Sequence, residues 1–508
     1  MVTTFRDLLA AHDPGLAAIG APGGRAWLNR GGLKQLAENV GRALNAVGIG
    51  REDRLAYVLA NGPEAASLFF SVAACATAAP LNPAYRAEEF RFYLDDLKPR
   101  ALILEAGAES PARAVAAELG IGVIELIPLR EQEAGAFRLD TSALRGAAPA
   151  RPGPAEMEDV ALVLHTSGTT ARPKIVPLTQ GNLTASARHI ATTLALSPAD
   201  RCLNIMPLFH IHGLMAAVTA SLYAGASVAC TPGFNAFRFF DWLAEIKPSW
   251  YTAVPTMHQA ILLRAQHHRE AARRAGLRLI RSSSASLPPQ VMAELEALFA
   301  APVIESYGMT EAAHQMASNP LPPKPRKPGS VGLPAGPEIA IMDEAGNLLP
   351  QGAAGEVVIR GPNVTRGYAD NPEANAKAFT KGWFRTGDQG YFDPDGYLFL
   401  TGRLKELINR GGEKVSPIEV DTVLMDHPAV AQVVTFALPH ERLGEEVAAA
   451  VVLREGANAT EQELRDFAAA RLAAFKVPRK IVFLKEIPKG ATGKLQRIGL
   501  AQKLGLAG

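Results

Sequence analysis

Short apolar runs alternate with helical patterns between residues 54 and 126, and this alternation limits the folds that are open to the chain. The run Arg54 to Leu59 precedes a helical segment from Pro63 to Ala79. The run Ala101 to Leu104 precedes a second helical segment, Pro111 to Leu119, where Ser110 can cap the first turn. Alternation of buried strands and helices predicts an α/β fold with a doubly wound core.

The alternation is interrupted and then resumes. A polar, Pro- and Ala-rich stretch, Ala147 to Glu158, is expected to be a loop, and a second series of short β-like runs starts at Val160 and passes through Ser227, Trp250 and Leu279. From Glu338 to Gly361 short strands with Gly turns predict a small β subdomain.

The chain has 508 residues, so more than one domain is expected. The segment Glu413 to Lys485 reads as helix, strand and helix, with the length of an independent α+β domain. We therefore expect a large N-terminal part and a small C-terminal α+β domain.

Two apolar stretches, Ala65 to Leu81 and Leu214 to Cys230, have about the length of a marginal membrane span. Both are rich in Ala, Ser and Gly and run into Pro or Gly turn signals. Each is therefore expected to be a buried helix followed by a strand, so no membrane span is expected. The N-terminal residues carry early acidic side chains and lack the long apolar core of an export signal.

Charge and cysteine usage indicate which partners and which compartment are favoured. A net charge of +2 gives no strong bias toward nucleic acid or acidic membranes. The three cysteines, Cys75, Cys202 and Cys230, lie far apart and form neither a CxxC pair nor a disulfide framework. This usage indicates a reducing compartment, and we expect a cytoplasmic protein that binds no nucleic acid.

The strongest local motif is TSGTTARPK, Thr166 to Lys174, directly after the apolar run Asp159 to Leu164. Gly and hydroxyl residues after a strand form a loop whose N–H groups and side chains can surround phosphate oxygens. Lys174 adds a positive charge suited to a polyphosphate. The spacing fits neither a Walker A loop nor a dinucleotide-binding glycine turn, and an ordinary polar turn is the competing interpretation.

Four further motifs follow in order. YGMTE, Tyr307 to Glu311, offers an aromatic ring for a base, a hydroxyl for a phosphate and a carboxylate for Mg²⁺. WFRTGD ends in Asp388, a carboxylate expected at a turn where it could accept both ribose hydroxyls. GRLKELI supplies a fixed cation, Arg403, and PKGATGK presents Lys494 on a glycine-flanked tip near the C-terminus.

Together these motifs resemble the adenylate-forming superfamily of acyl-CoA synthetases, luciferases and peptide-synthetase adenylation domains. The resemblance covers essentially the whole chain and is closest to the oxalate–CoA ligase branch. The segments that carry it are HTSGTTARPKIVPLTQGNL, PLFHIHGL, WYTAVPTMHQ, RSSSASL, SNPLPP and KELINRGGEKVSPIEVD.

The resemblance implies an ATP-dependent acid:CoA ligase that works in two steps. A carboxylate first attacks the α-phosphate of ATP and expels pyrophosphate, and the CoA thiolate then attacks the acyl-adenylate and releases AMP. ATP, Mg²⁺ and CoA are the implied cofactor and co-substrates, and a small carboxylic acid is the implied substrate. A domain of residues 1–401 is expected to bind ATP and the acid, residues 402–406 to form a hinge centred on Lys405, and residues 407–508 to form a mobile lid.

The resemblance also assigns roles to residues of the motifs. Thr310 is expected to touch the α-phosphate, Glu311 to ligate Mg²⁺, and Lys494 to bridge the α-phosphate and the attacking carboxylate before it swings away. The remaining nucleotide contacts are expected from the phosphate loop, from two strand ends and from the ribose-binding pair: Thr166, Ser167, Gly168, Thr169, Thr170, Lys174, Ser284, Ala285, Ser286, Glu305, Ser306, Tyr307, Asp388 and Arg403. Tyr307 is expected to stack on adenine. Asn409 stands where related aryl ligases carry a lysine, so no phosphate contact is assigned to it.

The acyl pocket is predicted from three polar residues: His210, a gate in the family, Ser284 and His314. Arg281 ranks behind them, because strand alternation can point it elsewhere. The HxH pair formed by His210 and His212 lacks a third ligand in the sequence, so a metal site is not expected there. His258 is left open between a core residue and a functional one.

Oxalate is the substrate that the resemblance favours, and malonate or another short acid, a fatty acid and an aryl acid remain alternatives. A non-catalytic nucleotide-binding regulator is the alternative from another class. An amino-acid adenylation domain is disfavoured, because no acidic residue for an ammonium group follows Phe209. Lys494 on its glycine-flanked tip is also a candidate for acetylation, which would make a lysine acetyltransferase and a deacetylase partners.

Overall fold

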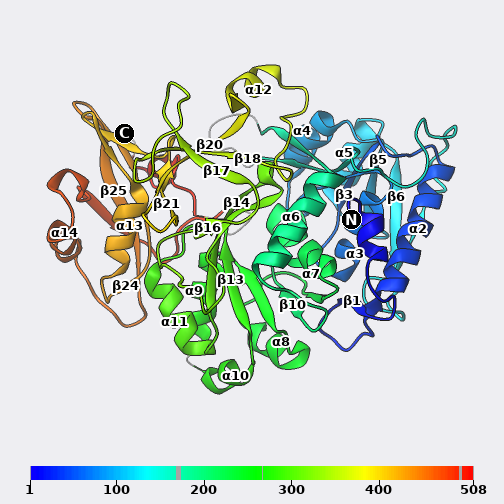
Figure 1. Ribbon diagram of the computed structural model, residues 1–508, viewed down its shortest axis with the longest axis horizontal. Helices are drawn as coiled ribbons and strands as arrows, with labels where there is room; N and C mark the ends of the chain where they lie inside the picture. The colour runs from blue at the N-terminus through cyan, green and yellow to red at the C-terminus, as the bar shows by residue number, and fades with distance from the viewer. Residues whose placement is uncertain (1, 167–172, 266, 491–494, 507–508) are drawn as a thin grey trace.

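The computed structural model describes residues 2–166, 173–265, 267–490 and 495–506. Figure 1 shows a large part made of two extended sheets with helices around them, a small sheet above their junction, and a C-terminal part at one end. The mixed α/β architecture with a small C-terminal domain confirms the predicted fold class.

The first extended sheet is a doubly wound α/β unit, as the strand and helix alternation predicts. Its inner strands are parallel, and antiparallel strands close both edges. In spatial order the strands are β7 (Phe137–Asp140), β6 (Val123–Pro128), β5 (Ala101–Glu105), β3 (Arg54–Val58), β4 (Thr77–Pro80), β8 (Val160–His165) and β9 (Ile175–Thr179).

The second extended sheet repeats this plan, with parallel strands inside and antiparallel strands at the edges. In spatial order its strands are β16 (Leu333–Pro334), β15 (His314–Ser318), β14 (Val303–Met309), β13 (Leu279–Ser283), β12 (Trp250–Ala253), β10 (Arg201–Asn204), β11 (Ser227–Cys230), β1 (Ala17–Gly20) and β2 (Leu28–Asn29).

Helices cover both sheets. Ser110 accepts a hydrogen bond from the backbone N–H of Ala112 at the start of α5, as the sequence predicts. The helices of the large part are α1 (Phe5–Ala10), α2 (Arg30–Ala46), α3 (Pro63–Ala73), α4 (Ala87–Leu97), α5 (Pro111–Glu118), α6 (Gln180–Thr193), α7 (Ala220–Tyr223), α8 (Phe239–Ile246), α9 (Pro255–Ala265), α10 (Arg269–Arg274), α11 (Pro289–Phe299) and α12 (Pro372–Ala378).

Two irregular helical turns lie beside the second sheet. The segment η1 (His212–Thr219) is a π-helix that continues into α7, and η2 (Thr310–Ala312) is a single 3₁₀ turn between β14 and β15. Within η1 the Thr219 hydroxyl donates to the backbone carbonyl of Leu214, five residues earlier (2.7 Å). The apolar stretch 214–230 is therefore helix followed by strand, and 65–81 likewise gives α3 and β4, as predicted. Among the residues that the structure describes, no helix is both long and apolar enough to cross a membrane.

The predicted small β subdomain is a separate sheet of five strands. It contains β17 (Glu338–Met342), β18 (Gly355–Arg360), β19 (Phe379–Thr380), β20 (Trp383–Phe392) and β21 (Leu398–Arg403).

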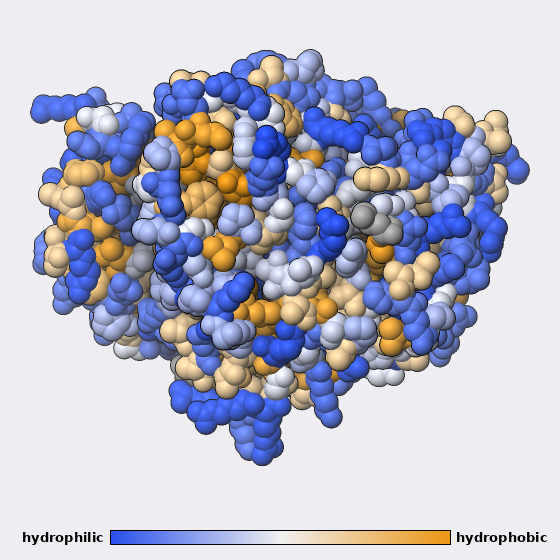
Figure 2. All heavy atoms as spheres, in the orientation of Figure 1, coloured by the Kyte–Doolittle hydropathy of each residue, from blue (hydrophilic) through white to orange (hydrophobic). Residues whose placement is uncertain are grey.

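The all-atom view in the orientation of Figure 1 shows hydrophilic residues over most of the visible surface of the molecule, with apolar residues in separate small patches (Figure 2).

The C-terminal part is richer in strands than the helix–strand–helix prediction. A long antiparallel pair, β24 (Val430–His440) and β25 (Gly444–Leu453), forms its centre. The other elements are β22 (Ile408–Arg410), β23 (Glu413–Val415), α13 (Pro417–Met425), α14 (Glu461–Ala469), η3 (Ala474–Lys476), β26 (Lys480–Phe483) and α15 (Leu500–Lys503).

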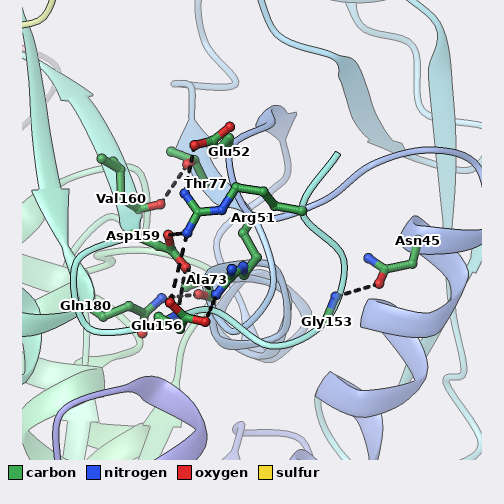
Figure 3. Close-up of polar contacts among 11 residues, drawn as sticks. Asn45, Arg51, Glu52, Ala73, Thr77, Gly153, Glu156, Asp159, Val160 and Gln180 are labelled. Carbon is green, nitrogen blue, oxygen red and sulfur yellow. Dashed lines mark hydrogen bonds and ion pairs between the residues drawn. The ribbon is translucent and has the colours of Figure 1, made fainter. Parts of the chain in front are cut away.

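An ionic network anchors the chain just before β8. Arg51 contacts both Glu156 (2.5 Å) and Asp159 (3.3 Å), and Asp159 also accepts the backbone N–H of Glu156 (2.7 Å). The Thr77 hydroxyl donates to the carbonyl of Val160 (2.6 Å), the first residue of β8 (Figure 3). These contacts fix the entry of the strand that leads into the predicted phosphate loop.

Candidate active site

The motif residues meet where the two extended sheets and the small sheet adjoin. Ser284 follows the carboxyl end of β13, and Tyr307 lies in β14, the parallel neighbour of β13. Thr310 and Glu311 lie on η2, and His314 begins β15. Parallel strands place their carboxyl ends at one edge of a sheet, which is where open α/β sheets bind ligands.

The ends of the predicted phosphate loop are tied together. Thr166 donates its backbone N–H to the carbonyl of Lys174 (2.9 Å), and the backbone N–H of Lys174 donates to the Thr166 hydroxyl (3.2 Å). The two ends of the loop, which follow β8 and precede β9, are therefore held together. Four predicted phosphate contacts, Ser167, Gly168, Thr169 and Thr170, lie outside the described residues.

Tyr368 joins the predicted phosphate lysine to the predicted magnesium ligand. The ammonium group of Lys174 lies 4.4 Å from the centre of the Tyr368 ring, and the Tyr368 hydroxyl donates to Oε1 of Glu311 (2.9 Å). Burial raises the pKa of the Glu311 carboxyl. A cation beside this carboxylate would therefore offset the cost of its charge. The sequence motifs did not point to Tyr368.

The donor set fits Mg²⁺ held largely by a polyphosphate. Among the described residues, no group of three His, Cys, Asp or Glu side chains could hold a metal ion. Mg²⁺ commonly takes one or two carboxylates and completes its shell with phosphate oxygens and water. Glu311 alone fits that pattern.

The predicted ribose-binding residues form one cluster with Tyr307. The Tyr307 hydroxyl donates to Asp388, and Nε of Arg403 lies 3.2 Å from Oδ1 of Asp388. The nearby Asp388 carboxylate raises the pKa of Arg403, so the guanidinium stays charged. Asp388 and Arg403 are directly paired on β20 and β21.

The expectation of a turn at Asp388 was wrong. The residue lies inside β20, because the WFRTGD segment pairs with β18 and with β21 through a local irregularity. Gly387 takes a positive φ of 74° there. The Thr386 hydroxyl accepts the backbone N–H of Asp388 (3.1 Å). An irregular strand, and not a turn, therefore holds the Asp388 carboxylate next to Arg403 and Tyr307.

The acyl-pocket candidates lie around a residue that sequence reasoning did not select, His212. Its Nδ1 lies 3.0 Å from the Ser284 hydroxyl, and its Nε2 lies 2.7 Å from the Thr252 hydroxyl. The rings of His212 and His314 meet edge to face at 4.9 Å. The backbone N–H of His212 donates to Nδ1 of His210 (3.3 Å). All three predicted pocket residues thus contact His212.

Two of these pocket residues have an unusual backbone. Ser284 has a φ of 75° and His314 a φ of 100°, in the left-handed region that residues other than glycine rarely adopt. Such conformations cost about 1–3 kcal/mol and cluster at functional sites. The fold therefore holds both side chains in place against a local preference.

Glu305 and Ser306 use their side chains within the protein. The Glu305 carboxyl accepts the backbone N–H of Leu287 (2.8 Å), and the hydroxyls of Ser306 and Ser318 lie 2.9 Å apart. Ala285 and Ser286, by contrast, are exposed just beyond Ser284. The latter two residues are open to a ligand at the end of β13.

The contacts of three further residues, His258, Arg281 and Asn409, show whether each lies in the core or near the site. His258 is fully buried beside the Tyr251 hydroxyl (3.2 Å), and burial lowers its pKa to about 3, so it is a core residue. Arg281 is fully buried, and its side chain donates to the Gln315 side chain (3.4 Å). Asn409 accepts the backbone N–H of Gly412 (3.1 Å) in the turn between β22 and β23, which is consistent with assigning it no phosphate contact.

The connection between the large and small parts is exposed at Lys405. This residue lies in the turn between β21 and β22. The Ser416 hydroxyl donates to the carbonyl of Thr401, and Arg497 lies 3.6 Å from Glu406. Lys494, the predicted bridging lysine, lies outside the described residues.

A second set of contacts joins the small part to α9 and α11. Arg454 pairs with Glu294 of α11 (3.2 Å), and the Gln259 side chain of α9 donates to the carbonyl of Ala431 (3.4 Å). These contacts border a cavity of about 420 Å³ between α9, α10 and α11 and the small part.

Comparisons with known proteins agree with this geometry. Residues 7–369 match the AMP-binding enzyme family, and residues 419–494 match the AMP-binding enzyme C-terminal domain. The chain is 48% identical to an oxalate–CoA ligase of Arabidopsis thaliana over 91% of this chain and 90% of that protein. It is 43% identical to an oxalate–CoA ligase of Saccharomyces cerevisiae over 89% of this chain and 87% of that protein. The crystal structure of ATP-bound MatB from Rhodopseudomonas palustris superposes with a TM-score of 0.88, at 30% identity and 99% coverage of both chains.

Proposed function

The chain belongs to the AMP-binding enzyme family and is an AMP-forming acid:CoA ligase, and we propose that the acid it activates is oxalate. The two relatives named above, both oxalate–CoA ligases, support this substrate. In the first step a carboxylate oxygen bonds to the α-phosphorus of ATP and pyrophosphate leaves. In the second step the CoA sulfur bonds to the acyl carbon, AMP leaves, and the thiol proton is released.

The observation that carries the substrate proposal is the polar character of the acyl pocket. A dianion such as oxalate brings a second carboxylate out of water, and this is very costly unless the pocket supplies donors. Ser284, His314 and His210 lie together around His212, as described above. A fatty acid would instead require an apolar tunnel. The donor-rich site therefore favours a short diacid.

Each step of the nucleotide chemistry has residues suited to it. We infer that Lys174 and the loop starting at Thr166 hold the β- and γ-phosphates, and that Asp388 and Arg403 hold the ribose. Mg²⁺, when bound at Glu311, would neutralise phosphate charge during attack. The protein's contribution is then mainly position and charge neutralisation.

The predicted domain plan remains a proposal. We propose that residues 1–401 bind ATP and the acid, that 402–406 form the hinge, and that 407–508 close over the site. The exposed turn at Lys405 and the match of residues 419–494 to a separate C-terminal family support this division. Cytoplasmic location is part of the same proposal, because three dispersed and buried thiols suit a reducing compartment.

Acetylation of Lys494 is proposed as a way to switch the enzyme off. Acetylation removes the positive charge that would bridge two anions in the first step. Homogeneously acetylated protein should therefore lose ATP–pyrophosphate exchange, and retention of full exchange would reject the proposal.

A substrate screen tests the function directly. CoA consumption should be measured with oxalate, malonate, acetate, cinnamate and palmitate, and oxalate should give the highest kcat/KM.

His314→Ala should lower kcat/KM for oxalate by about ten- to a hundred-fold, the effect of losing a donor to a charged group. The KM for ATP should stay near the wild-type value. Ser284→Ala should do less, because a hydroxyl carries no charge.

His267→Ala is the matched control, since His267 is an exposed histidine in the turn between α9 and α10. A wild-type preference for palmitate or cinnamate would reject oxalate as the substrate. Unchanged use of oxalate by His314→Ala would reject the pocket assignment and leave the ligase activity standing.

A further inference from the structure

We propose that His212 and Thr252 are positioning residues that orient the Ser284 hydroxyl so that its proton points at the acid. This inference rests on the proposed function, in which Ser284 binds an anionic acid. The three side chains come from η1, β12 and the end of β13, and two hydrogen bonds connect them.

The direction of these hydrogen bonds follows from counting donors and acceptors, starting at Thr252. This residue is fully buried, and its hydroxyl must find an acceptor for its one proton. The partner that the structure gives it is Nε2 of His212, at 2.7 Å. The hydroxyl therefore donates, and Nε2 accepts.

An imidazole whose Nε2 accepts carries its proton on Nδ1. In His212 this nitrogen lies 3.0 Å from the Ser284 oxygen, so Nδ1–H donates to that oxygen. The Ser284 oxygen is thereby used as an acceptor from inside the protein. Its own proton is then directed away from His212.

Ser284 is the member of the chain that faces outward. Thr252 and His212 are fully buried, whereas Ser284 is half-buried and is followed by the exposed Ala285 and Ser286. Its φ of 75° keeps the residue at the end of β13 in a conformation that serine rarely adopts. An outward O–H at this position is the donor that an acid carboxylate needs.

The neighbouring ring, His210, is held in the opposite tautomer. Its Nδ1 accepts the backbone N–H of His212 (3.3 Å), so its proton lies on Nε2. The two histidines of the HxH pair thus carry their protons on different nitrogens. The pair is used for directed hydrogen bonding, which gives the spacing a purpose other than metal binding.

Reversal of the network shows why Thr252 matters. Without the Thr252 hydroxyl, Nε2 of His212 loses its donor, and the tautomer with the proton on Nε2 becomes accessible. Nδ1 would then accept from Ser284, and the serine proton would turn inward. The acid would meet two oxygen lone pairs in place of a donor, a repulsive contact for a carboxylate.

Thr252→Val tests the proposal, because valine has the shape of threonine and lacks the hydroxyl. We expect kcat/KM for oxalate to fall about five- to ten-fold, no less than in Ser284→Ala, because the variant loses the same hydrogen bond to the acid. Thr252→Ser restores the hydroxyl and should recover most of the activity. Thr252→Ala provides a second variant without the hydroxyl if valine does not fold, and thermal melting checks that each variant is folded.

Two readouts separate this role from general support of the fold. In the proposed function the serine hydroxyl serves the second carboxylate, which acetate lacks. The ratio of kcat/KM for oxalate to that for acetate should therefore fall in Thr252→Val, whereas a merely loosened site would lower both values by the same factor. In a Ser284→Ala background Thr252→Val should have little further effect, because the group it orients is gone. Equal activity of Thr252→Val and wild type, or full additivity with Ser284→Ala, would overturn the proposal.

Failure of the substrate proposal would look different. If the wild-type enzyme prefers another carboxylic acid, oxalate is wrong, and the same variants are then measured with the preferred acid. Loss of activity in Thr252→Val with rescue in Thr252→Ser would still support the positioning role. Absence of both effects with every acid would reject it.

Discussion

Glu305 is a buried carboxyl group whose titration should appear in the stability of the protein. It is 2% exposed, and burial raises its pKa to about 8, above its usual value of 4.5. The folded protein therefore keeps a proton that the unfolded chain releases. The stability due to this proton is fully present below pH 4.5 and is lost as the pH rises through 8, at up to about 1.4 kcal/mol per pH unit.

Glu305→Gln cannot titrate and has nearly the same shape. Thermal melting of both proteins at several pH values between 5 and 9 should show the melting temperature of the wild type falling relative to that of the variant as the pH rises. Parallel curves would contradict the prediction. Other titrating groups are common to both proteins and cancel in the comparison.

Arg281 should cost stability where it lies. It is fully buried, its Nε and Nη1 have no hydrogen-bond partner among the residues that the structure describes, and burial lowers its pKa to about 9. Replacement of buried charges by apolar side chains of similar volume often stabilises proteins by about 1–4 kcal/mol. Arg281→Met should therefore raise the melting temperature.

Arg281→Lys is the control, because it keeps a buried charge and should bring no gain. A lower melting temperature for Arg281→Met than for wild type would show that the guanidinium contributes to stability through a contact not described above.

Single residues within motifs could be placed from the sequence, and residues that join motifs could not. Tyr307, Glu311, Ser284 and His314 lie on or next to β13, β14 and β15, which are neighbours in the second sheet. Tyr368 contacts Glu311 from 57 residues away, and His212 contacts Ser284 from 72 residues away. Contacts of that separation depend on how the sheets pack, which local spacing does not encode.

At the scale of elements, the hinge is the place to test the two-step mechanism. Lys405→Pro fixes φ and restricts Leu404. The turn is exposed, so the variant should fold, yet it should be held closer to one arrangement of the two parts. One half-reaction should fall far more than the other when ATP–pyrophosphate exchange and thioester formation from supplied acyl-adenylate are compared.

Lys405→Ala is the matched control, because it removes the same side chain and leaves the backbone free. It should keep both half-reactions within a few-fold of wild type. Intact half-reactions in Lys405→Pro would remove this residue as the pivot.

Most strands and helices of the large part follow their sequence patterns, but the pairing of β24 and β25 in the small part and the helix type of η1 could not be predicted. The pair β24 and β25 mixes valines, which favour strands, with alanines and Pro439, which do not, and its residues pair along both strands apart from a register shift between Val430 and Gln432. The segment η1 is buried throughout, so its apolar residues carry no periodicity that could distinguish a helix type. In both cases burial decided the structure.

At the scale of the whole molecule, the pair Arg454 and Glu294 should favour the arrangement described above. The pair is about one-third exposed, so its contribution is discounted to at most about 1 kcal/mol. Arg454→Ala should slow one half-reaction by up to about five-fold without slowing the other. Stopped-flow measurement of both half-reactions checks this prediction.

Arg138→Ala is the control for charge alone, since Arg138 is an exposed arginine on β7, in the first extended sheet. It should leave both half-reactions unchanged. Equal slowing of both by Arg454→Ala would indicate lost stability in place of a shifted arrangement.

The division into a large and a small part could be predicted from length and motif order. The cavity between α11 and the small part could not, because it exists only when the two parts meet. Interfaces of this kind depend on the relative placement of domains, and no local pattern in either domain specifies that placement.

The π-helical segment η1 gives the chain a sensitivity to length as well as to composition. A π-helical turn holds more residues than an α-helical turn, so removal of one residue from η1 could leave a good α-helix behind. Each residue of an α-helix turns the chain by about 100°, and His212 would then face away from Thr252 and Ser284. In the descent of such enzymes, a single-codon deletion could thus change the choice of acid in one event while every side chain of the pocket was retained.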